Sequence, residues 1–124
     1  MYYKDLTLYK YGHRYPDSLN IGWLEKGHEF PTGNFPEKEE VLKILKSMEI
    51  LNMYKGWHSC DYCNPYEKTK DGRTLIIKDR NGNGEYHVSL NGQKYQAPIL
   101  IVHYIESHNY KPPQEFIDAV LNSK

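Results

Sequence analysis

The chain has 124 residues, of which 39% are hydrophobic and 12 are tyrosines, and its 16 basic residues balance its 16 acidic ones. The balanced charge disfavours nucleic acid and anionic lipid as partners, because no overall field attracts the chain to them. The mean hydropathy of -0.80 and the short apolar runs exclude a membrane-spanning chain, and the many aromatic residues argue against disorder. A single domain over residues 1–124 is therefore expected.

The first 35 residues form an aromatic, loop-rich segment. Alternation over residues 6–11 predicts a short strand. Residues 27–33 are rich in turn formers, which predicts irregular backbone there.

A core-facing amphipathic helix is predicted over residues 36–52. Pro36 suits a first helical position, and three glutamates follow in the first turn, where the helix dipole favours negative charge. The apolar residues recur at helical spacing and are Val41, Leu42, Leu45, Met48 and Leu51.

The middle of the chain predicts β-structure. Residues 67–73 are expected to form a charged loop, residues 74–78 a strand and residues 80–84 a turn. Asn91-Gly92 lies between two segments, 85–90 and 93–96, and is a strong signal for a tight hairpin because both turn residues need positive φ.

Two helices are predicted at the end of the chain. The first runs from Pro98 to about His108, with Asn109 available for a left-handed cap. Pro112 and Pro113 interrupt it, and a last helix from Pro113 carries apolar residues at helical spacing within the segment 112–124.

Two closely spaced pairs of metal-binding residue types predict a structural zinc site. Cys60 and Cys63 are the only cysteines and lie three residues apart, while His103 and His108 lie five apart. Two thiolates and two imidazoles form a tetrahedral donor set that Zn²⁺ prefers. Five residues on an α-helix separate two side chains by about 140°, so both histidines reach one ion only if the helix tightens or ends at His108.

The resulting expectation is an α+β domain in which a β-hairpin and helices surround a zinc-finger or treble-clef-like site, the zinc module being residues 57–111. The ligand set has alternatives, because His58 or His87 could replace one of the two later histidines. The competing interpretations are two reduced thiols with packed histidines, and a redox dithiol, which Asn64-Pro65 after the second cysteine disfavours.

An enzyme is the alternative class. His87, Asn91 and His103 lie on a predicted hairpin and the helix after it, as in His-Asn-His nucleases, and a metal-dependent hydrolase or nuclease would use them. Two points argue against the nuclease: the tight turn already accounts for an asparagine at position 91, and His103 is assigned to the zinc site. A hydrolytic metal site would also need an open coordination position with His58 or His28 beside the ion.

The chain resembles a family of small uncharacterised bacterial proteins. The resemblance implies that the cysteine and histidine segments belong to one module, and it marks Trp23, His28 and Phe30-Pro31 as a further segment. The residues that carry it are Gly22-Trp23-Leu24, Gly27-His28, Phe30-Pro31-Thr32-Gly33, His58, Cys60, Cys63, Gly82 to Glu85, Tyr95, Ala97-Pro98, Leu100 to Tyr104, His108, Tyr110, Pro112-Pro113 and Phe116.

The expected function is that of a zinc-stabilised protein-binding or adaptor module, with a toxin-immunity system as a candidate setting. A partner protein is expected because a closed metal site and the absence of a catalytic motif leave no chemistry for the chain itself. A cytoplasmic location is expected, because no secretory signal precedes the cysteines and thiols persist in a reducing compartment.

Overall fold

The computed structural model describes residues 3–8, 18–48, 50, 58–60, 62, 66–68, 70–76, 81–82 and 84–123. The elements in chain order are β1 (Ser18–Asn20), α1 (Lys38–Ser47), β2 (His58–Ser59), β3 (Tyr66–Lys68), β4 (Thr74–Ile76), β5 (Asn81–Gly82), β6 (Glu85–Leu90), β7 (Gln93–Pro98), α2 (Ile101–Ser107) and α3 (Gln114–Leu121). The expected α+β class is confirmed.

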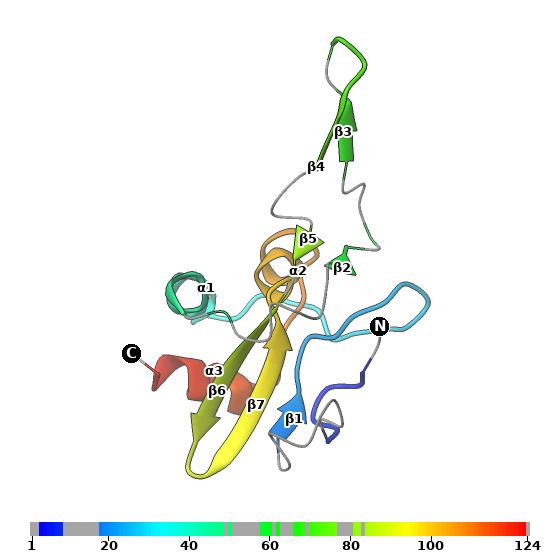
Figure 1. The fold of residues 1–124 in the computed structure, drawn as a ribbon. Coiled ribbons are helices and arrows are strands. Elements are labelled where there is room, and N and C mark those ends of the chain that lie inside the picture. Colours follow the sequence, from blue (N-terminus) through cyan, green and yellow to red (C-terminus); the bar gives the residue numbers. More distant parts are fainter. Residues whose placement is uncertain are drawn as a thin grey trace.

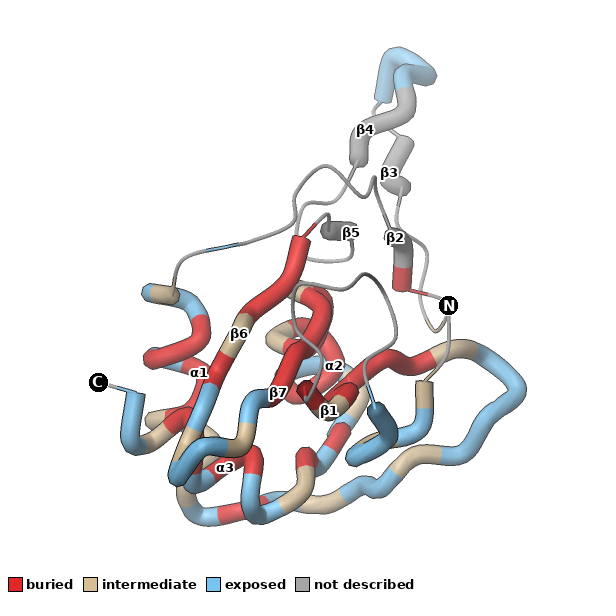
Figure 2. Tube along the Cα trace, turned by 60° about the horizontal axis from the view of Figure 1, so that its bottom comes forward, coloured by how far each residue is buried: buried red, intermediate tan, exposed pale blue. Residues whose placement is uncertain are grey.

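A three-stranded sheet with the strand order β1-β7-β6 is the centre of the fold. β6 and β7 are antiparallel, and β1 pairs with β7 in parallel. The helix α3 packs against β6, and α1 contacts both α2 and α3, so the helices and one face of the sheet enclose the core (Figure 1). Figure 2 shows the buried residues gathered in these helices and strands.

The core side chains alternate along the strands, as period-two geometry requires. Tyr86 and Val88 of β6 and Tyr95 and Ala97 of β7 are buried together with Phe116 of α3. The rings of Tyr95 and Phe116 lie edge to face with centroids 6.0 Å apart, and Tyr95 donates a 2.8 Å hydrogen bond to Glu115. This contact fixes α3 on the apolar face of the sheet.

The hairpin prediction is confirmed. β6 and β7 are joined by Asn91 and Gly92, which have φ values of 52° and 83°. The last helix is also confirmed: α3 begins directly after Pro113, and Phe116, Ile117 and Val120 are fully buried.

The predicted helix 36–52 is shorter in the structure. α1 starts at Lys38, and Met48 has a ψ of 155°, an extended conformation that ends the helix. Val41, Leu42 and Leu45 are buried as expected, and Met48 packs against the core. Leu51 lies outside the described residues.

The second predicted helix begins later than expected. Pro98 is the last residue of β7, where it is paired with Glu85, and α2 starts at Ile101. The sheet therefore takes Pro98, and residues 99–100 form a turn before the helix, because cross-strand pairing outweighs the local helix signal.

Three other predictions in the β-region and the N-terminal segment were wrong in whole or in part. The expected loop 67–73 begins as strand β3 and has turn and irregular backbone over residues 70–73, and the expected turn 80–84 contains β5, which pairs with β2. In the expected strand 6–11, Leu6 has a φ of 67° and Leu8 forms only an isolated bridge to Leu19. Residues 9–11, and residues 77–78 of the predicted strand 74–78, are outside the described part.

Irregular backbone over residues 27–33 is confirmed, apart from a single bridge between Thr32 and Tyr110. Figure 1 shows β3 and β4 projecting away from the helices and the central sheet. Among the described residues, no helix has both the length and the apolar character needed to cross a membrane.

A half-buried carboxylate joins the N-terminal segment to the residues that follow α2. Asp5 accepts hydrogen bonds from the backbone N–H of Gly22 (2.9 Å) and from the hydroxyl of Tyr110 (2.7 Å). Burial raises the pKa of Asp5 above its ordinary 3.8, although both hydrogen bonds act in the opposite direction. The ionised form is therefore less favourable in the folded chain than in the unfolded one.

This pKa shift predicts a pH-dependent stability. A raised pKa in the folded state favours folding most below pH 3.8, and that contribution is lost as the pH rises through the folded-state pKa of Asp5. We expect wild type to gain stability relative to Asp5→Asn as the pH falls from neutral toward about 4, measured by urea unfolding at each pH.

The matched control is Asp71→Asn, because Asp71 is exposed and its carboxylate lies 2.8 Å from the nearby guanidinium of Arg73. Its difference from wild type should vary much less with pH. A stability difference between wild type and Asp5→Asn that is constant from neutral to acid pH would contradict the assignment.

Candidate metal centre

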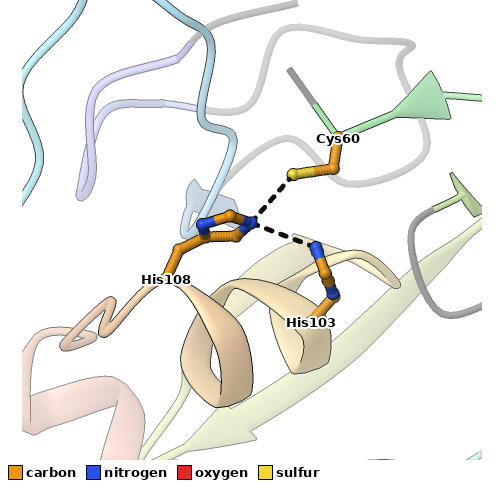
Figure 3. A group of neighbouring side chains, drawn as sticks. All are labelled: Cys60, His103 and His108. Atoms are coloured by element: carbon orange, nitrogen blue, oxygen red, sulfur yellow. Dashed lines mark hydrogen bonds between the residues drawn. The ribbon is translucent and has the colours of Figure 1, made fainter. Parts of the chain in front are cut away.

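Cys60 directly follows β2, a two-residue strand held by antiparallel pairing with β5. The side chain is 2% exposed and belongs to the hydrophobic core. The short β2–β5 pair thus positions the thiol of Cys60 in the interior beside α2, as Figure 3 shows.

The two histidines come from the middle and the end of α2. His103 is buried within the helix, and His108 is its C-cap, with φ -121° and ψ 14°. Asn109 then takes the left-handed conformation with a φ of 57°. Of the two alternatives that the spacing allowed, a tightened helix or one that ends at His108, the structure shows the second, and the two rings lie at a centroid distance of 4.9 Å.

The three side chains converge on one point. His108 Nε2 lies 3.3 Å from Cys60 Sγ and 3.1 Å from His103 Nε2 (Figure 3). One ligand atom from each residue lies within 4.8 Å of the others. Cys60, His103 and His108 are therefore close enough to bind a single metal ion.

Hydrogen bonding alone explains this geometry poorly. An imidazole nitrogen carries either one hydrogen or one lone pair in the ring plane, so it makes one well-aligned hydrogen bond. His108 Nε2 has two close neighbours, a sulfur and a nitrogen. Both short distances are compatible with one metal ion bonded to all three ligand atoms.

Aromatic rings surround the histidine at the helix end. The Tyr62 ring lies 5.4 Å from that of His108, and Phe30 lies 5.4 Å from Tyr62 and 6.1 Å from Tyr110, each distance joining ring centroids. Tyr104 completes the group at 6.3 Å from Tyr62. These rings give the centre an apolar surrounding, which strengthens electrostatic interactions within it.

The loop 27–33 supports the backbone that presents His108. Lys111 N donates to Pro31 O (3.0 Å), and Gly33 N donates to Asn109 O (3.1 Å). The turn-forming residues of this loop predict irregular backbone, but they do not predict its hydrogen bonds to the residues after His108. The one signal was the resemblance, which singled out Phe30 and Pro31.

A family model described as a domain of unknown function, DUF7919, matches residues 1–121. The chain belongs to the DUF7919 family. The match covers both the cysteine segment and the histidine segment. Searches of curated proteins and of solved structures give no match to this DUF7919 chain.

The other proposed ligands of the DUF7919 chain lie elsewhere or outside the described part. Cys63 is not among the described residues, and for His58 only the backbone of β2 is described, so both stay predictions. His87 does not join the cluster; its Nε2 lies 3.1 Å from Glu85 Oε1 on the central sheet. His28 is exposed, and its Nε2 lies 4.0 Å from Glu25.

The His-Asn-His arrangement is not assembled among the described residues. Asn91 is an exposed turn residue at the hairpin tip, four positions from His87, a distance of about 13 Å along a strand. His103 belongs to the cluster with Cys60 and His108. The three residues required by the nuclease hypothesis therefore do not meet.

Removing the aromatic support should weaken metal binding. We expect Phe30→Ala to raise the dissociation constant of a Co²⁺ probe about tenfold or more, because groups that hold metal ligands in place affect affinity by about 10–100-fold. Titration followed by the visible absorption of Co²⁺ measures this. Phe30→Leu is the matched control, since it retains most of the apolar volume and should bind nearly as wild type; equal affinity of Phe30→Ala and wild type would contradict the role.

Proposed function

We propose that this DUF7919 protein is stabilised by a structural Zn²⁺ ion bound by Cys60, Cys63, His103 and His108. The observation that carries the proposal is the pair of distances at His108 Nε2, 3.3 Å to sulfur and 3.1 Å to nitrogen. Tetrahedral Zn²⁺ with its usual bond lengths separates two nitrogens by about 3.3 Å and sulfur from nitrogen by about 3.6 Å. The donor types support the same ion, since thiolate and imidazole together suit zinc.

A structural role is supported by where the ligands come from. Cys60 follows a small strand pair, whereas both histidines belong to α2, so an ion bound to them joins parts of the chain that are 48 residues apart. The burial of Cys60 and His103, at 2% and 4% exposure, leaves little room for substrate at these two ligands. Cys63 as fourth ligand would close the coordination sphere, which is the property of structural zinc.

The proposed centre shares with zinc-finger and treble-clef-like modules a cysteine segment attached to a helix that supplies further ligands. In this chain the helix contributes from its middle and its end, at His103 and His108. The zinc-finger-like feature that we propose is this order of the ligands along the chain.

Equimolar zinc in protein purified without added metal is the expected result, measured by elemental analysis. Cys60→Ser and His108→Ala should lose most of it, and chelation should lower the melting temperature of wild type by about 10 °C or more, because binding free energy of structural zinc is also folding free energy.

His28→Ala is the matched control, an exposed histidine outside the cluster, and it should keep both zinc and melting temperature. Folded wild-type protein that contains no zinc and melts at the same temperature with and without added Zn²⁺ would overturn the proposal. Cys63→Ser tests the fourth position: full zinc content in that variant would remove Cys63 from the ligand set.

We further propose that the zinc-stabilised module acts as an adaptor that binds another protein in a bacterial cytoplasm, with a toxin-immunity system as one such setting. The support is the small size and the balanced charge of the chain. Affinity capture from the native cells should retain a stoichiometric protein partner with wild type and lose it with Cys60→Ser. Retention of no protein above the level seen with Cys60→Ser would count against a partner.

A further inference from the structure

The face of the central sheet turned away from the core is polar and yet mostly buried. Four of its side chains are at most 1% exposed: Ser18 and Asn20 of β1, Glu85 of β6 and Gln96 of β7. A polar group out of water is costly unless it finds hydrogen-bond partners. A buried polar atom on this face that lacks a hydrogen-bond partner therefore marks a position where a ligand could bind.

Most of the buried polar atoms are satisfied within the chain. Asn20 Nδ2 donates to Thr7 Oγ1 (3.2 Å) and to Leu8 O (3.1 Å), and Glu85 Oε1 lies 3.1 Å from His87 Nε2. On this face of the sheet, two buried oxygens have no hydrogen-bond partner among the described residues, Asn20 Oδ1 and Gln96 Oε1. The other end of the Gln96 amide is bonded, since its Nε2 donates to Ser18 Oγ (3.2 Å).

Exchanging the two ends of the Gln96 amide does not remove this deficiency. Ser18 can donate as well as accept, so it satisfies either end, and the other end is then left as an unused donor or acceptor. In both assignments one buried donor or acceptor of the Gln96 amide is unsatisfied among the described residues. A hydroxyl group suits both cases because it donates and accepts.

A surface pocket lies at this position. Its volume is about 220 Å³, and its lining consists of Ser18, His87, Val88, Ser89, Lys94, Tyr95 and Gln96. Sites for drug-sized ligands are about 300–1,000 Å³, so this pocket suits a small molecule of few atoms. The sheet register supports the arrangement, because Lys94 is paired with both Ser18 and Ser89, and Gln96 with His87.

Lys94 sets the charge of the pocket. Glu85, whose Oε1 lies 3.1 Å from His87 Nε2, does not belong to the described lining of the pocket. Lys94 is the remaining formally charged side chain of the described lining, and it is exposed at the pocket edge. The lining therefore favours an anion.

We propose that this pocket binds a small hydroxylated organic anion, whose carboxylate or phosphate contacts Lys94 and whose hydroxyl satisfies Gln96. The site is separate from the metal cluster, since none of Cys60, His103 and His108 lines it. The inference stands independently of the proposed zinc ion and of the proposed protein partner.

The test uses the full chain as purified, labelled with ¹⁵N, and two probes that represent the two anion sources, malate and glycerol 3-phosphate. At constant ionic strength, at least one should cause saturable amide shifts at Ser18, Lys94 and Gln96. Lys94→Gln should weaken that binding about tenfold, the usual effect of losing one charge-assisted contact, whereas Lys43→Gln, an exposed lysine of α1, should not.

Matched ligands separate charge from hydroxyl recognition. Succinate lacks the hydroxyl of malate and should bind more weakly, glycerol lacks the charge and should not bind, and Gln96→Leu should abolish the preference for malate over succinate. The proposal is overturned if neither anion gives saturable shifts up to about 10 mM. It is also overturned if Lys94→Gln and Lys43→Gln have the same effect, or if the shifting amides lie away from the sheet.

Discussion

The approach of Cys60 to the two histidines of α2 is the constraint on which much of the local structure depends. A thiol and two imidazoles within 4.8 Å of one another require three backbone features at once. The β2–β5 pairing delivers Cys60, α2 ends one residue before His108, and Asn109 adopts a left-handed conformation that turns the chain away. The ion that we propose at this point would offset the cost of burying these polar side chains in a hydrophobic core.

The surroundings of the cluster extend this constraint to the N-terminal part of the chain. Phe30 packs against Tyr62 and Tyr110, and the loop around Pro31 hydrogen-bonds the backbone after His108. Tyr110 in turn donates to Asp5, which also accepts from Gly22. A Cβ at Gly22 would lie 2.9 Å from side-chain atoms of Ile101, so the loop contacts the start of α2 as closely as glycine permits. The segment 3–8, the loop near Phe30 and α2 are thus mutually supported.

Sequence patterns predicted the parts of this structure that depend on local chemistry. The Asn91-Gly92 hairpin, the helix after Pro113 and the end of α2 at His108 all follow from residues whose φ preference or missing N–H is decisive. The spacing of Cys60, His103 and His108 also predicted the cluster, whereas Cys63 stays a prediction. The pairs β2–β5 and β3–β4 were missed because two or three residues carry too little pattern, and tertiary pairing decides their conformation.

The polar face of the sheet could not be predicted for a different reason. Alternating polar residues in β6 and β7 are typical of a strand with one face in water, but Glu85 and Gln96 are buried in the structure. Burial depends on segments far away in sequence, such as Thr7 and Leu8 beside Asn20. Only the folded chain distinguishes a solvated face from one that holds a pocket.

X-ray absorption at the zinc edge of the purified protein tests the central claim most directly, because it reports the atoms bonded to the ion. The account predicts a four-coordinate ion with sulfur at about 2.3 Å and nitrogen at about 2.0 Å, the sulfur contribution decreasing in Cys60→Ser protein reloaded with zinc. Zinc bound only by nitrogen and oxygen, with the same spectrum in wild type and Cys60→Ser, would contradict it.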